Sequence, residues 1–148
     1  MSADAVDDMD FLLADDAGQV AIQQTLEQSR AAIAHWAAKV LIVRHPDIDD
    51  AASARGRRLW QQELDRHLRK LQETWDDASA LGLYADWVRR RRLAQGGRSE
   101  SLALAMTVLC EGLARHLEPD LARPLVAATV GAFVIPLRPG VATYVGLP

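Results

Sequence analysis

The stretch that decides the fold is LGLYADWVRRRRLAQGGRSESLALAMTVLCEGLARHL, residues 81–117. Gly96 and Gly97 are the only adjacent glycines in the chain, and such a pair ends a helix because glycine adopts left-handed backbone angles without strain. Ser99 is placed to cap the helix that follows, with Glu100 in its first turn, where a negative charge suits the helix dipole. The stretch therefore predicts a short helix, a glycine break and a long helix.

The long helix is apolar on nearly every side. One face is formed by side chains spaced by four, three and four residues, and the opposite side carries small and apolar residues rather than charges. A helix of this kind must be buried on more than one side. Its second cover is either another part of the same chain or a second copy of it. For a homodimer the expected interface is Leu102, Met106, Leu109, Leu113, Leu125 and Val130.

The apolar spacing elsewhere predicts further helices. A long one is expected over residues 17–44, capped by Asp15 or Asp16, and it ends at Pro46 because the residue before a proline leaves the helical region. A second is expected over residues 51–80, with Gly82 marking its end, and a short one over 84–95. The last is expected to start at Pro119 and end near residue 133. The fold class is therefore all-α, with five to six helices.

The two ends of the chain differ from its middle in composition. Residues 1–16 contain six aspartates and no basic residue, which is typical of an acidic, partly flexible arm. Residues 17–135 are expected to form one helical sensor or dimerisation domain, a natural count for 148 residues. Residues 136–148 have strand-like composition but no partner run, so an extended tail or linker is expected there.

Composition excludes several classes of protein. The net charge of −3 argues against a general nucleic-acid binder. The single cysteine, Cys110, excludes an internal disulfide framework and is expected to be a small buried core residue. No signal peptide is visible, and no run reaches the roughly 18 apolar residues of a membrane span, so a cytoplasmic protein with no membrane partner is expected.

The residues that carry chemistry form no recognisable catalytic motif. The four histidines lie on different segments, and His67 stands out because it lies beside an apolar helical stripe, from which a haem can in principle hang. A hydrogen-bonded core histidine is the ordinary interpretation. Carboxylates follow surface and capping patterns, and the arginine run 89–92 is expected to be a solvated face with acidic neighbours. The tryptophans are expected to be core residues, with a ligand cavity between helices as the alternative.

One segment resembles a known family. Arg92, Gln95 and Gly96, followed by Ser99-Glu100 and the apolar helix, look like a segment of the globin-related sensor domains, in the non-haem form found at the amino terminus of RsbR-type stressosome proteins. The resemblance implies a globin-like bundle, a homodimer made by the last two helices of each subunit, and signalling through protein contacts in an assembly. It also implies that Arg92 stands where haem-binding relatives carry the iron ligand, so that no cofactor is expected.

These observations predict a non-catalytic sensory or regulatory module that acts through homodimerisation and protein contacts. One alternative is a haem- or small-molecule-binding sensor of globin-like fold that uses His67. Another is a small helical enzyme, whose mark would be a buried cluster of carboxylates with perturbed pKa values. The signal and the downstream partner are not encoded in any recognisable motif.

Overall fold

The computed structural model of the chain describes residues 3–49 and 53–135, with side chains from residue 17 onward. Its elements are α1 (Ala3–Arg44), α2 (Ala54–Thr74), α3 (Ala78–Ala94), α4 (Ser99–His116), α5 (Pro119–Thr129) and the π-helical turn η1 (Val130–Val134). Every regular element in these ranges is helical, which confirms the all-α prediction. A globin-like arrangement of the helices stays a prediction. The expected tail, 136–148, lies outside the described residues.

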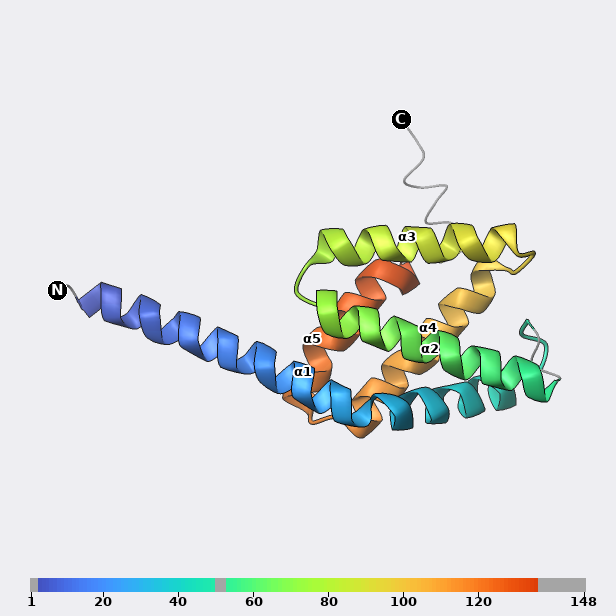
Figure 1. Cartoon of the computed structure of the whole chain (residues 1–148), viewed down its shortest axis with the longest axis horizontal. Helices are drawn as coiled ribbons and strands as arrows, with labels where there is room; N and C mark the ends of the chain where they lie inside the picture. The colour runs from blue at the N-terminus through green and yellow to red at the C-terminus, as the bar shows by residue number, and fades with distance from the viewer. Residues whose placement is uncertain (1–2, 50–52, 136–148) are drawn as a thin grey trace, which may run out of the picture.

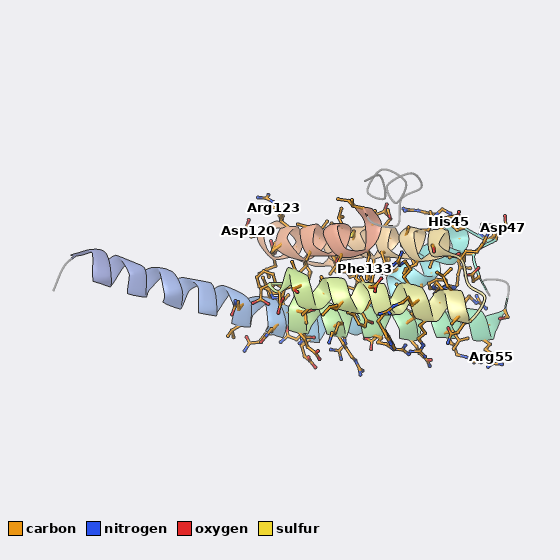
Figure 2. All side chains as sticks on the ribbon, turned by 90° about the horizontal axis from the view of Figure 1, so that it is seen from above. His45, Asp47, Arg55, Asp120, Arg123 and Phe133 are labelled. Atoms are coloured by element: carbon orange, nitrogen blue, oxygen red, sulfur yellow. The ribbon has the colours of Figure 1, made fainter. Side chains whose placement is uncertain are left out.

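The helices form two layers, which Figure 2 shows from above: α4 and α5 lie in one and α2 and α3 in the other. Helix α1 packs against both α2 and α4, and its N-terminal part extends away from the bundle (Figure 1). The helix predicted to start at residue 17 therefore begins much earlier, at Ala3. Asp15 and Asp16 lie within it and do not cap it. Its predicted end at residue 44 is confirmed.

Helix α4 lies at the centre of the core, as its composition predicts. Leu102, Leu109 and Leu113 have no exposed surface, and Gly112 faces α1, where an added Cβ would lie 3.2 Å from Ile33 Cγ2. The other cover of α4 is supplied by α5 and η1 of the same chain. The chain's own helices thus bury α4 on more than one side, and a second copy is not needed for this.

The break between α2 and α3 differs from the prediction. The sequence predicts one helix to residue 80, yet α2 ends at Thr74 and α3 begins at Ala78. Asp77 makes this break, because its side chain accepts a hydrogen bond from the Ala80 backbone N–H at 3.0 Å and so caps α3. Gly82 then lies inside α3. Its freedom to end a helix is not used there.

The glycine break is confirmed. Gly96 has φ +82°, the left-handed conformation that glycine accepts best, and Gly97 N–H donates to the Arg92 carbonyl at 2.8 Å. Helix α4 begins at Ser99, but the N-cap residue is Arg98, and it makes no side-chain capping bond. The predicted Ser99 cap is therefore wrong by one position. The last helix starts at Pro119 as predicted and continues through η1 to Val134.

Candidate functional site

A pocket of about 550 Å³ lies between α2 and α3, closed at one end by the glycine turn. Helix α2 contributes residues spaced by one turn, so that one stripe of this helix faces the pocket. Helix α3 contributes a second stripe from its C-terminal half. The charged, polar and large apolar side chains of the lining include Asp49, Leu59, Trp60, Glu63, Arg66, His67, Trp87, Arg91 and Arg92.

His67 forms the inner wall of the pocket and is 2% exposed. Its Nδ1 lies 2.8 Å from the Tyr84 hydroxyl, and its ring lies 5.7 Å from that of Phe133, which stands between the two layers (Figure 2). Its Nε2 faces Glu63 Oε1 at 3.7 Å, beyond hydrogen-bond distance. Because an ionised Glu63 favours a proton on Nε2, Tyr84 donates to Nδ1. Nε2 is left buried, with no hydrogen-bond partner in the described part of the chain.

Arg92 joins the two carboxylates of the pocket. Its Nη2 donates to Glu63 Oε2 at 2.6 Å and its Nη1 to Asp49 Oδ2 at 3.1 Å. Its guanidinium lies 4.3 Å from the centre of the Trp60 ring, in a cation–π contact. The side chain is only 10% exposed, and its Nε finds no hydrogen-bond partner within residues 17–49 and 53–135. One arginine therefore links α3, α2 and the loop before α2.

Asp49 carries this network on to the start of α4. Its carboxylate accepts hydrogen bonds from the Arg98 backbone N–H at 3.2 Å and from Arg98 Nε at 3.3 Å. The Arg98 Nη2 also donates to the Asp47 carbonyl at 2.9 Å, and Trp60 Nε1 donates to the Asp49 carbonyl at 2.6 Å. A negative charge at this position also suits the N-terminus of α4. The pocket wall and the central helix are therefore connected through polar contacts.

Burial and neighbouring charges shift the pKa values of this network. Burial opposes the ionisation of Glu63, but the neighbouring His67 and Arg92 outweigh it and bring the pKa down to about 2. Burial also opposes ionisation of Asp49, and here the Arg98 hydrogen bonds and the Arg92 charge lower the pKa. Burial lowers the pKa of His67 and raises that of Tyr84 to about 12. At neutral pH the carboxylates are charged, and His67 and Tyr84 are neutral.

The pKa values of Glu63 and Tyr84 lie far from neutral pH. A general acid or base works best with a pKa near the operating pH. The shift of Glu63 makes it a much weaker base, and the shift of Tyr84 makes it a much weaker acid. The cluster is partly buried and its pKa values are perturbed, as the enzyme alternative requires, and the shifts of Glu63 and Tyr84 lead away from neutral pH.

A haem held by His67 does not fit these residues. Its Nδ1 is engaged by Tyr84, and its Nε2 is enclosed and faces the Glu63 carboxylate at 3.7 Å, the place that iron would need. Arg92, at the position that the resemblance equates with the iron ligand, is held by two carboxylates. In residues 17–49 and 53–135, no group of three or more histidines, cysteines or carboxylates is placed to hold a metal ion.

The other residues of the resemblance lie at the mouth of the pocket. Gln95 is exposed, and its backbone N–H closes the end of α3 on the Arg91 and Arg92 carbonyls. Gly96 forms the turn that follows. The three residues Arg92, Gln95 and Gly96 therefore share one site, although only Arg92 contributes a buried side chain.

The residues predicted for the dimer interface do not line this pocket, and most of them are buried in the core of the fold. At most 1% of each of five side chains is exposed, namely Leu102, Met106, Leu109, Leu113 and Leu125. Only Val130 is partly exposed. These five residues are packed against the chain's own helices, so they offer no surface to a second copy in this conformation. Pairing of two chains itself stays a prediction.

Several surface and core predictions are confirmed in part. Arg89 and Arg90 pair with Asp86, as expected of a solvated face, whereas Arg91 makes no ion pair within the part of the chain that the structure describes. Cys110 is buried, and burial raises the pKa of its thiol to about 12. Among the tryptophans, Trp60 is 3% exposed but Trp87 is 44% exposed at the pocket. Trp60 belongs to the core, and Trp36 and Trp75 pack against it, so the core prediction holds for these three and fails for Trp87.

Sequence reasoning missed Glu63, Asp49 and Tyr84. A signal for Glu63 was present, because it stands four residues before His67 and therefore on the same helical face. Asp49 follows Pro46 in the loop before the second helix, and Tyr84 lies at the start of the short predicted helix, so neither position has a local pattern that marks a site. Their meeting with Arg92 depends on how α2, α3 and the loop at residue 49 pack, which no local pattern encodes.

Comparison with known proteins does not identify a relative. The chain matches no protein-family model, no curated protein and no solved structure. Among the helices that the structure describes, none combines the length and the apolar composition of a membrane span.

Proposed function

We propose that this protein is a non-catalytic sensory or regulatory module that receives its signal as a small molecule in the pocket between α2 and α3. The observation that carries the proposal is the inner wall of that pocket, where His67 Nε2 and Arg92 Nε are buried without hydrogen-bond partners among the residues that the structure describes. Folded proteins rarely leave such atoms unpaired, and each exception calls for an explanation. A bound molecule that rearranges the network supplies one.

The network also provides a route by which occupancy reaches the rest of the fold. Arg92 is shared between Glu63 and Asp49, and Asp49 in turn holds Arg98 at the start of α4. A ligand that contacts Arg92 changes the strength of the ion pair between Arg92 and Asp49. The start of α4 is therefore the element expected to respond, and protein contacts in a signalling assembly would then detect the change.

Ligand binding is tested with a panel of cationic, neutral and anionic small organic molecules, scored by the rise in thermal midpoint of the full chain. A molecule that binds only the folded state raises the midpoint with its concentration, by mass action. Location is read from the indole N–H signals in the proton–nitrogen NMR spectrum, assigned with single Trp→Phe variants. We expect the Trp60 and Trp87 signals to move. Those of Trp36 and Trp75, which lie outside this pocket, are the internal control.

Coupling is tested in the same samples by amide hydrogen exchange. We expect binding to change the exchange of residues 98–102 and to leave the middle of α1 unchanged. A panel without any binder, or shifts confined to Trp36 and Trp75, would refute the proposed function. Binding at Trp60 and Trp87 without a change at the start of α4 would leave a binding protein but remove the sensory role.

A further inference from the structure

The mouth of the pocket carries two positive charges that the protein itself does not neutralise. Arg66 on α2 and Arg91 on α3 are both exposed, and neither makes an ion pair with any residue that the structure describes. Both lie close enough to Tyr84 for their charges to favour its ionised form. The inner arginine is different, because both terminal nitrogens of Arg92 already pair with Asp49 and Glu63. An incoming anion therefore meets Arg66 and Arg91.

The same mouth carries large apolar groups. Leu59 is 45% exposed and Trp87 is 44% exposed, on opposite helices of the pocket. The Trp87 ring lies against Tyr84, at 6.0 Å between ring centres and 25° between planes, and carries the Arg91 guanidinium 5.2 Å from its centre. Flat rings pack well on such surfaces, and the guanidinium of an arginine matches a carboxylate through two parallel hydrogen bonds.

Resting on the proposed function, we infer that the ligand is a small aromatic carboxylate, with its carboxylate between Arg66 and Arg91 and its ring against Leu59 and Trp87. Charge and apolar surface are both needed in this arrangement. A simple inorganic anion satisfies only the arginines, and a neutral ring satisfies only the apolar wall. The pocket, at about 550 Å³, has room for two fused rings.

The inference is tested by calorimetric titration of the full chain with 2-naphthoate. Its neutral counterpart 2-naphthamide has nearly the same shape. We expect the amide to bind at least about tenfold more weakly, because a charge-assisted contact is lost. Inorganic phosphate, acetate and the linear carboxylate hexanoate are each expected to bind more weakly than 2-naphthoate. Equal affinity for the amide would show that the negative charge of the ligand is not needed. Equal affinity for hexanoate, acetate or phosphate would show that the aromatic ring is not needed, and either result would overturn the inference.

Matched variants locate the charge contact. The double substitution Arg66→Ala with Arg91→Ala removes the two mouth arginines and is expected to weaken 2-naphthoate about tenfold or more. The control is Arg69→Ala with Arg90→Ala, which removes one exposed arginine from each of the same helices, with the same change in net charge, away from this pocket. We expect the control to bind 2-naphthoate as the wild type does. Equal losses in both variants would reduce the effect to overall charge and overturn the assignment.

The outcome also separates this inference from the proposed function. If a neutral or cationic molecule from the panel moves the Trp60 and Trp87 signals while 2-naphthoate does not bind, the pocket is a ligand site but the ligand class is wrong. If no molecule of any charge binds, the proposed function and the inferred ligand class are both refuted.

Discussion

Helix α4 and the α2–α3 pocket differ in the kind of side chains that surround them. Around α4 the buried side chains are almost all apolar, with Leu102, Leu109 and Leu113 fully enclosed. Around the pocket, half-buried carboxylates, an arginine, an imidazole and a phenol contact one another, and two buried polar atoms have no hydrogen-bond partner among the described residues. A polar network with unpaired atoms contributes less to stability than an apolar core of the same volume. The comparison teaches that the core holds the fold, and that the pocket side is where a function other than stability is to be sought.

The largest effect is expected in the core. Leu109→Ala removes a fully buried side chain from the middle of α4 and is expected to lower the free energy of unfolding by about 2–5 kcal/mol, because it leaves a cavity. Urea denaturation measures the change. The control is Leu104→Ala on the same helix, where 38% of the side chain is exposed, and a clearly smaller loss is expected there. Equal losses at the two positions would contradict the described burial of α4.

A smaller effect, confined to acid, is expected at Glu63. Its pKa falls from 4.5 to about 2 in the folded protein, which at 1.36 kcal/mol per pH unit is worth about 3 kcal/mol. Because the folded pKa is the lower one, this stability is fully present above pH 4.5 and is lost as the pH falls towards 2. Glu63→Gln removes the titration. Urea denaturation from pH 6 to pH 2 is therefore expected to show a shallower loss in the variant.

The matched control for Glu63 is Glu73→Gln on the same helix, where the carboxylate is 67% exposed and lies 3.9 Å from Lys70. This variant is expected to follow the wild-type curve through the whole pH range. If Glu63→Gln also followed that curve, the ion pair with Arg92 would not form in solution, and the contrast between the two regions would lose its main electrostatic support.

The smallest effect is expected at the mouth of the pocket. Replacing Arg66 and Arg91 together by alanine is expected to change the free energy of unfolding by no more than about 1 kcal/mol at neutral pH, since both are exposed and make no ion pair within the described residues, and Arg91 has only its contact with the Trp87 ring. Thermal and urea unfolding measure this. A large loss would mean that these arginines stabilise the fold. The contrast between the α4 core and the α2–α3 pocket would then no longer separate stability from binding.

The sequence by itself determined the helical class, the break at Gly96 and the start of the last helix at Pro119. These features depend on residues that act locally, through backbone freedom or through the fixed angle of proline, so that the chain encodes them wherever it folds. It also determined that α4 is buried on several sides, because an apolar helix has no favourable exposed face. It placed the break between α2 and α3 too late, because a single capping aspartate, Asp77, outweighed the apolar periodicity around it.

Only the tertiary structure decided what covers α4 and where the polar groups meet. The same apolar surface is satisfied equally well by α1, α5 and η1 or by a second chain, and hydrophobic burial does not distinguish them because it is not directional. The network of Asp49, Glu63, His67, Tyr84 and Arg92 joins three segments that lie far apart in the sequence. Hydrogen bonds and ion pairs depend on distance and angle within a few tenths of an ångström, and the packing of α2 against α3 sets those values.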